Sequence, residues 1–164
     1  MRPTTERVKT ALFNLLTEKI KDAYVLDLFA GTGGLGIKAL EKGAREVVFV
    51  ERDRRCSENI RRRLKKLGFY DFQIICTDFR KALNLLRRRE KRFEIILADP
   101  PYQQGFEELI LQNIGQYAIL LENGILAIEH YKKSILPSEA GNLRLYKRRE
   151  YGDTVLSLYE NCHL

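Results

Sequence analysis

The 164-residue sequence predicts one α/β domain. We expect a mostly parallel, doubly wound sheet of seven strands, with helices on both faces and an antiparallel hairpin at the end. Short apolar runs alternate with segments of helical periodicity from residue 24 to residue 129, a pattern typical of βαβ units. Two further strand-like runs follow each other directly near the end of the chain. Since there is no linker, low-complexity tract or internal repeat, residues 1–164 are expected to form a single domain.

The first 21 residues predict an N-terminal helix that packs on the core. Thr4 or Thr5 can cap it, and Glu6 lies favourably in its first turn. Apolar residues then recur at helical spacing, which gives the helix one apolar face: Val8, Ala11, Leu12, Leu15 and Leu16.

Five apolar runs predict parallel strands, each buried on both faces: residues 24–28, 47–50, 72–76, 93–98 and 125–129. Gly68 is expected to end one of the intervening helices, and another helix starts at Phe106. Residues 130–142 predict a loop with room for one short helix. Residues 143–149 and 154–159 then predict a hairpin around the turn Tyr151-Gly152-Asp153.

The composition favours some kinds of binding partner and argues against a metal site and a membrane location. The net charge of +7 suits a polyanionic partner, of which nucleic acid is the commonest. Three cysteines without paired spacing predict reduced thiols, and the two histidines form no metal-ligand pattern. No apolar run approaches the ~20 residues that span a bilayer, and no signal peptide opens the chain. We therefore expect a cytoplasmic, monomeric protein with no metal and no membrane contact.

A glycine-rich loop follows the first strand, and glycines let a backbone approach a ligand closely. Gly31, Gly33 and Gly36 satisfy the spacing G-x-G-x-x-G, so a nicotinamide or flavin dinucleotide is one candidate cofactor. Glu51, at the end of the second strand, has the place of an acid that binds ribose hydroxyls. Both dinucleotides and adenosyl cofactors use such an acid.

Asp27 distinguishes these cofactor classes. A carboxylate facing the glycine loop repels a pyrophosphate but attracts the ammonium of a methionine moiety. Asp78 follows the third strand and can accept a hydrogen bond from an adenine amino group, with Phe79 beside it for ring packing. With Glu51 and Asp99, these acids end four strands at one edge of the sheet. Any one of them alone is better explained as a helix N-cap, but four beside a glycine loop predict a cofactor site.

The segment Asp99–Tyr102, Asp-Pro-Pro-Tyr, follows the fourth apolar run. Two prolines stiffen the chain, so that Asp99 and the Pro100 carbonyl become fixed acceptors. These acceptors could orient the exocyclic amine of a flat base while Tyr102 stacks on its ring. Taken alone, the segment is equally well explained as a rigid strand-to-helix turn.

Together these residues resemble class I methyltransferases that use S-adenosylmethionine, and more narrowly the RsmD family. Five motifs carry the resemblance over nearly the whole chain: Arg2–Lys9 with Leu12–Leu16, Asp27–Gly33, Val50–Asp53, Asp99–Tyr102 and Tyr151–Thr154. The resemblance implies a Rossmann-like fold and methylation of guanine N2 in bacterial 16S rRNA. The implied substrate is the small ribosomal subunit or its assembly intermediate, at a single guanine.

The resemblance also implies residue roles. Asp27 and the glycine loop would hold the methionine end of S-adenosylmethionine, Glu51 the ribose, and Asp78 with Phe79 the adenine, leaving S-adenosylhomocysteine as product. The expected cofactor residues are Asp27, Phe29, Ala30, Gly31, Thr32, Gly33, Glu51, Arg52, Asp78 and Phe79. The expected target-amine site consists of Asp99, Pro100 and Tyr102.

RNA contacts are expected near the same edge of the sheet. The basic runs 61–66 and 87–92 close helices that lead away from that edge, so they could steer RNA but not hold the target base. Members of the RsmD family usually begin with a further Gly- and Arg-rich strand-forming segment. This chain starts at the Arg-Pro-Thr signature, so we expect either a lost segment or a different mode of RNA docking. The candidate RNA contacts are Arg2, Arg7, Lys9, Lys132, Lys133, Arg148, Arg149 and Tyr151.

Three alternatives remain open from the sequence. The first is another amino-methyltransferase, acting on adenine N6 in DNA or on a different RNA base. A DNA enzyme of that kind normally needs a target-recognition domain, for which this chain has no room. The second is an NAD-dependent oxidoreductase, suggested by the glycine spacing. The third is a non-catalytic RNA-binding module that retains a degenerate cofactor fold.

Overall fold

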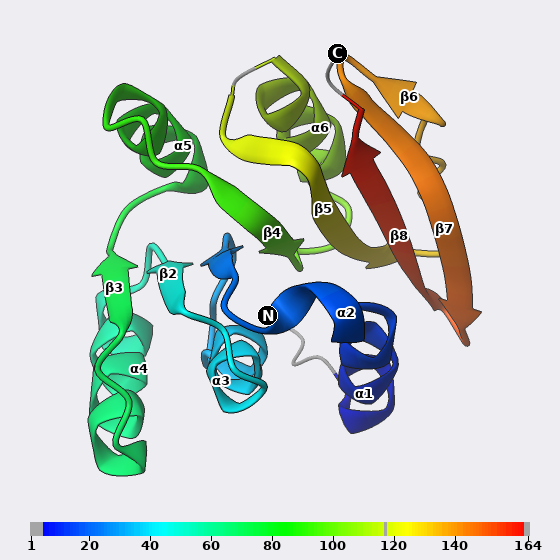
Figure 1. The fold of residues 1–164 in the computed structure, drawn as a ribbon. Helices are drawn as coiled ribbons and strands as arrows, with labels where there is room; N and C mark the ends of the chain where they lie inside the picture. Colours follow the sequence, from blue (N-terminus) through cyan, green and yellow to red (C-terminus); the bar gives the residue numbers. More distant parts are fainter. Residues whose placement is uncertain (1–4, 117, 163–164) are drawn as a thin grey trace.

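The computed structural model describes residues 5–116 and 118–162. Within these ranges one eight-stranded sheet has the order β3-β2-β1-β4-β5-β8-β7-β6 (Figure 1). The strands are β1 (Tyr24–Asp27), β2 (Glu46–Val50), β3 (Phe72–Ile75), β4 (Phe93–Ala98), β5 (Leu120–Tyr131), β6 (Glu139–Ala140), β7 (Leu143–Tyr151) and β8 (Thr154–Asn161). The helices are α1 (Glu6–Leu15), α2 (Thr17–Ile20), α3 (Gly34–Glu41), α4 (Arg54–Leu67), α5 (Phe79–Arg88) and α6 (Phe106–Gln116).

The five strands β3, β2, β1, β4 and β5 pair in parallel. The inner four are largely buried on both faces, whereas the edge strand β3 is only partly buried. Val25 and Val47 pack into a core shared with α1, α3 and α4. Their neighbours Leu26 and Val48 point the other way, into a second core with α5 and α6. The two helical layers cover opposite faces of the sheet in Figure 1. Burial on both faces explains why these strands are continuous apolar runs rather than alternating ones.

Helix α1 begins where the Thr5 side chain accepts a hydrogen bond from the Val8 amide at 3.2 Å. Its buried face, including Val8 and Leu12, packs on the core beside the sheet. The Arg7 guanidinium lies over the Tyr151 ring, 5.6 Å from its centroid. Thus α1 also contacts the end of β7, which is more than a hundred residues away in sequence. None of the helices in the described ranges has the length and apolar character needed to cross a membrane.

The prediction of seven strands is wrong, because the described chain forms eight. The segment predicted as a loop with a short helix instead contributes β6, which pairs antiparallel with the start of β7. Gly115 of α6 and Gly141, which follows β6, allow these two elements to pack closely. A Cβ on Gly115 would lie 2.5 Å from the Ala140 carbonyl oxygen, and Gly141 has φ +58°. A two-residue strand has no periodicity to detect, so only its pairing with β7 and its contact with α6 reveal it.

Strand β5 is also longer than the predicted 125–129. Asn123-Gly124, a dipeptide typical of turns, lies inside β5 as an irregularity. The register against β4 shifts there, with Phe93 opposite Leu120 and Ile95 opposite Ile125. Asn123 takes φ +64°, which asparagine tolerates better than most residues. The strand therefore bends without ending.

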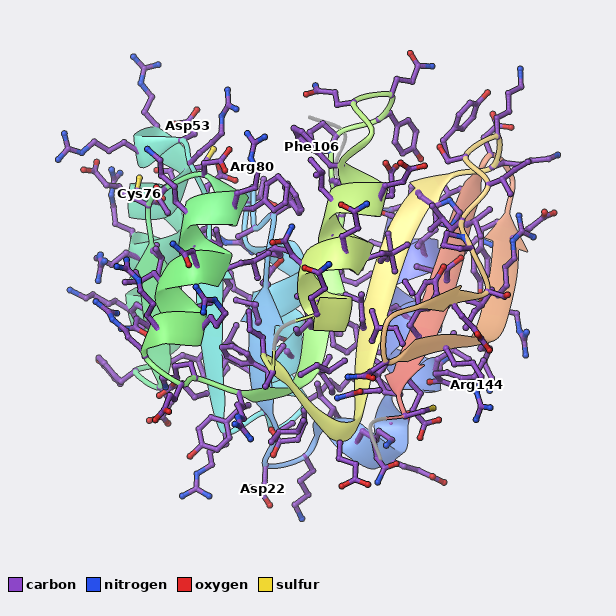
Figure 2. The ribbon with its side chains drawn as sticks, turned by 90° about the horizontal axis from the view of Figure 1, so that it is seen from above. Asp22, Asp53, Cys76, Arg80, Phe106 and Arg144 are labelled. Carbon is purple, nitrogen blue, oxygen red and sulfur yellow. The ribbon has the colours of Figure 1, made fainter. Side chains whose placement is uncertain are left out.

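The carboxyl ends of the parallel strands form one edge of the sheet. Asp53, Cys76, Arg80 and Phe106 lie along this edge in Figure 2, and Asp22 lies at the opposite edge. In the antiparallel part, Thr154 pairs with both Tyr131 and Tyr151. The turn between β7 and β8 therefore reaches the same carboxyl edge, as the sequence predicts.

Gly36 fixes how closely α3 packs on the sheet. A Cβ at this position would lie 2.8 Å from Cζ of Phe49, closer than real Cβ atoms approach other atoms. Because Phe49 is fully buried in β2, its ring has no free space to move into. The absence of a side chain at residue 36 thus sets the distance between helix and strand.

Gly36→Ala is expected to destabilise the protein by about 1–3 kcal/mol, the usual cost of overpacking a core. Urea unfolding would measure the change. Gly34→Ala is the matched control, since a Cβ there meets nothing closer than the Lys9 ammonium nitrogen at 3.4 Å. Equal stability of the two variants would contradict this account, whereas partial rescue of Gly36→Ala by Phe49→Leu would support it.

Candidate active site

The glycine loop is held by backbone hydrogen bonds and by α4. The Gly31 amide donates to Oε1 of Glu51 at 2.8 Å, and the Ala30 amide donates to the Val50 carbonyl at 2.9 Å. Gly33 takes φ +85°, and a Cβ there would lie 3.0 Å from Cγ1 of Ile60. The loop thus follows a path that needs glycine for its backbone conformation and for its contact with α4.

Asp27 ends β1 directly beneath this loop, with only 1% of its surface exposed. Its Oδ2 accepts a hydrogen bond from the Gly36 amide at 3.0 Å, in the first turn of α3. Its Oδ1 is buried and has no hydrogen-bond partner among the described residues. A carboxylate therefore occupies the place at the helix N-terminus where a dinucleotide fold would present amides to a pyrophosphate.

The pKa of Asp27 is raised to about 7, chiefly by burial. The hydrogen bond from the Gly36 amide opposes this rise, and the charges of Asp99 and Glu51 contribute to it. Two carboxylates from neighbouring strands are thus close enough to influence Asp27. The electrostatic effect of Asp99 and Glu51 on Asp27 is what the sequence analysis expects if acids from successive strands lie at one edge of the sheet.

Beside the glycine loop lies a pocket of about 350 Å³. Among the predicted cofactor residues, it is lined by Phe29, Glu51, Arg52, Asp78 and Phe79. It is also lined by residues that the sequence did not single out for the cofactor: Leu28, Val50, Asp53, Cys56, Thr77, Pro101, Gln104 and Phe106. The other predicted cofactor residues, Asp27, Ala30, Gly31, Thr32 and Gly33, belong to the adjoining loop rather than to this lining.

Three phenylalanine rings form one wall of the pocket. The centroid of Phe29 lies 4.8 Å from that of Phe79, and the centroids of Phe79 and Phe106 are 5.2 Å apart. Phe29 and Phe106 are stacked with an interplanar angle of 17°. Such a wall offers flat apolar surface to a planar ligand such as a nucleobase.

Glu51 lines the pocket and also accepts hydrogen bonds from two backbone amides. Its Oε1 holds the Gly31 amide, and its Oε2 accepts from the Asp53 amide at 2.8 Å. The carboxylate thereby connects the glycine loop to the turn that starts α4. Each carboxylate oxygen accepts two hydrogen bonds when fully satisfied, so both oxygens retain capacity for a ligand hydroxyl.

The Asp99–Tyr102 segment is anchored to the antiparallel part of the sheet. The Tyr102 hydroxyl lies 3.2 Å from the Thr154 hydroxyl, and the Tyr102 ring lies 5.5 Å from the Tyr131 ring between centroids. Asp99 is half-buried and Pro100 is buried. The tyrosine proposed to stack on a base therefore has a fixed neighbour on β5 and another on β8.

The candidate RNA residues fall in several environments. Arg2 lies outside the described residues. Arg7 and Tyr151 contact each other, and Arg148 forms an ion pair with Glu150 at 2.9 Å. Lys9 is only 17% exposed: it pairs with Glu6 at 3.0 Å and also lies against the glycine loop, near Gly34. Lys9 therefore has a neighbour at the start of α3, directly after the glycine loop, that its sequence position did not indicate.

Two contacts at the site were not predicted from the sequence. Nη1 of Arg63 donates to the Thr32 carbonyl at 2.7 Å, although the basic run that contains Arg63 was expected to face solvent at the other edge. Phe106 was expected only as the first apolar residue of a helix. Its place directly after the Asp-Pro-Pro-Tyr segment could have indicated that it lines the pocket. No local sequence signal indicates that Arg63 bonds to Thr32, 31 residues away in the chain.

Comparison with solved structures identifies the class of protein. A solved structure described as "Putative methyltransferase yhhF from Escherichia coli" matches with a TM-score of 0.86 and 29% identity, covering 98% of this chain and 87% of that one. The architecture is therefore that of an α/β methyltransferase, with a mostly parallel sheet followed by antiparallel strands.

The family follows from the sequence matches. Residues 1–160 match the family described as "Conserved hypothetical protein 95". The Bacillus subtilis protein "Putative rRNA methyltransferase YlbH" is 36% identical over 97% of this chain and 87% of its own length. "Ribosomal RNA small subunit methyltransferase D" of Escherichia coli is 29% identical over 98% of this chain and 79% of its own length. The chain belongs to this family, the RsmD family, as its motifs indicated.

The raised pKa of Asp27 predicts a pH-dependent stability. The native state holds a proton on Asp27 up to a pH of about 7, whereas the unfolded chain loses it near its ordinary value of 3.8. Stability should therefore fall as the pH rises between these values. We expect the stability of Asp27→Asn to rise by about 2–3 kcal/mol relative to wild type between about pH 5 and about pH 8.

Urea unfolding at several pH values would measure this gain. Asp71→Asn, which changes an exposed acid just before β3, is the matched control. A difference between wild type and Asp27→Asn that stays constant with pH would contradict the assignment of a proton to Asp27.

Proposed function

We propose that this protein transfers a methyl group from S-adenosylmethionine to the exocyclic N2 of a specific guanine in 16S rRNA of the small ribosomal subunit. The observation that carries the proposal is that β1 and β4 end side by side: Asp27 pairs with Leu97, two residues before Asp99, and the charge of Asp99 contributes to the raised pKa of Asp27. Asp99 begins the Asp-Pro-Pro-Tyr segment, and Asp27 lies beneath the glycine loop. The proposed acceptor for the target amine and the proposed partner of the methionine ammonium would therefore share one site. The names of the relatives support rRNA as the substrate.

The residues present fit an adenosyl cofactor. The buried, unpartnered Oδ1 of Asp27 suits a cationic ammonium, and the loop formed by Ala30, Gly31, Thr32 and Gly33 would hold the same end of the molecule. Glu51 and Arg52 would bind the ribose, and Asp78 with Phe79 and Phe29 the adenine. When bound, S-adenosylmethionine supplies a methyl group made electrophilic by its sulfonium.

The chain's own task is to orient a poor nucleophile. The Asp99 carboxylate and the Pro100 carbonyl would accept the two N–H bonds of the amine and turn its lone pair out of the plane of the base. Tyr102, fixed by Thr154 and Tyr131, would support the flipped base by stacking. Asp99 would also stabilise the positive charge that grows on nitrogen. The proton can leave to solvent afterwards, so no covalent enzyme intermediate is needed.

RNA would approach over the carboxyl edge of the parallel strands, at the turn between β7 and β8. Arg7, Arg148, Arg149 and Tyr151 gather there, with Lys132 tied to the same turn by a 2.8 Å bond from its amide to the Asp153 carbonyl. Arg2 and Lys9 complete the proposed contacts.

Methyl transfer would be tested with unmethylated small subunits and labelled S-adenosylmethionine, followed by mass spectrometry of the nucleosides. We expect N2-methylguanosine, and a rate that falls roughly 10²–10³-fold in Asp99→Ala, in line with losses of a fixed electrostatic partner. Cofactor binding should persist in this variant. Asp71→Ala, an exposed acid remote from the edge, is the control. Label in N6-methyladenosine, no label at all, or a near wild-type rate in Asp99→Ala would overturn the proposal.

Arg7→Ala is expected to raise KM for the RNA about three- to tenfold with little change in kcat, because it removes a phosphate-binding cation and not a reacting group. The slope of log binding against log salt should become shallower by about one unit. Arg88→Ala removes the same charge at the other end of the molecule, on the last turn of α5, and serves as the control. Identical effects of the two variants would indicate general electrostatic attraction instead.

A further inference from the structure

Arg80 forms a fork with Asp78 at the rim of the pocket. Its Nε lies 3.0 Å from Oδ1 of Asp78, and its Nη2 lies 3.1 Å from Oδ2. Its backbone amide also donates to Oδ1, at 2.9 Å, because Asp78 is the N-cap of α5. Three donors of one residue thus hold a single carboxylate.

The same guanidinium covers the aromatic wall. It lies 5.4 Å from the centroid of Phe79 and 5.9 Å from that of Phe106. Both rings and Asp78 line the pocket. Figure 2 shows Arg80 and Phe106 at the same edge of the molecule, on α5 and α6 respectively. Arg80 therefore joins the acidic and the aromatic sides of the pocket.

The hydrogen bonds from Arg80 use most of the hydrogen-bonding capacity of the Asp78 carboxylate. A carboxylate oxygen accepts two hydrogen bonds. Oδ1 of Asp78 already accepts two from Arg80, and Oδ2 accepts one. Arg80 thus uses three of the four acceptor positions of Asp78 and leaves one of them, on Oδ2; the backbone amide of Lys81 also interacts with this carboxylate. The hydrogen bond from the Arg80 side chain also lowers the pKa of Asp78, so the group stays ionised and cannot act as a donor.

We propose that Arg80 determines which nucleobase the pocket accepts, by fixing Asp78 as an acceptor with one open position. The inference rests on the proposed function, which supplies the adenosyl ligand. An adenine amino group donates to that position, whereas a 6-oxo base places a second acceptor against it. A site built to accept a hydrogen bond discriminates strongly against a ligand that cannot donate one. Arg80 acts through Asp78, so it is a positioning residue and not a catalytic one.

A purely structural role for Arg80 makes a different prediction. If Arg80 only stabilised the start of α5, its removal would weaken all adenosyl-like ligands equally. If it positions Asp78, its removal lets the carboxylate rotate away from a 6-oxo group, and the preference between the two bases shrinks. The ratio of two affinities thus separates the two roles.

The experiment compares binding of S-adenosylhomocysteine and S-inosylhomocysteine by calorimetry. We expect wild type to prefer the adenine ligand at least about tenfold, and Arg80→Ala to reduce that preference about fivefold, as the loss of one oriented hydrogen bond allows. Asp78→Asn should reduce it further, since its amide can donate to the 6-oxo group. Arg87→Ala is the matched control: it removes the same charge from the last turn of α5 and should leave the ratio unchanged.

An unchanged ratio in Arg80→Ala, with equal losses for both ligands, would overturn this inference alone. Arg80→Gln serves as a second variant if the alanine form unfolds, because it keeps side-chain bulk but lacks the fork. Failure of wild type to bind S-adenosylhomocysteine would overturn the proposed function, and this inference with it.

Discussion

The buried carboxylate of Asp27 is the constraint on which the site depends. It ends the central strand, lies beneath the glycine loop and holds the first turn of α3 through the Gly36 amide. Gly36 in turn has no side chain because Phe49 occupies that space. The end of β1, the glycine loop and the start of α3 are therefore held together by Asp27 and Gly36. The pKa of about 7 expresses the penalty for burying this charge, which a cationic ligand would relieve.

The other acids at this edge are both structural and available to a ligand. Glu51 holds the Gly31 and Asp53 amides while it lines the pocket. Asp78 caps α5 and also faces the same pocket. The two explanations that the sequence left open for such residues, N-cap and ligand group, are therefore compatible. A carboxylate fixed by backbone amides has lost its rotational freedom before any ligand arrives, which is what a specific binding site requires.

The antiparallel strands connect the proposed RNA surface to the Asp99–Tyr102 segment. Thr154 starts β8 between the ends of β5 and β7, and its hydroxyl lies against that of Tyr102. Tyr151 ends β7 beneath Arg7 of α1. The late Tyr-Gly-Asp-Thr motif is thus not a remote hairpin turn. It is the place where the first helix, the last strands and the Asp-Pro-Pro-Tyr segment come together.

The sequence by itself determined the parallel core, the glycine loop and the edge at which the acids gather, since continuous apolar runs, glycine spacing and strand ends are local properties. Tertiary structure decided the eighth strand, the irregularity in β5 and the neighbours of Tyr102. It also decided the hydrogen bond from Arg63 to Thr32 and the position of Arg80 over Phe106. These features join residues distant along the chain through contacts that leave no periodic signal. A long, flexible arginine can reach many partners, and only the packed fold selects one.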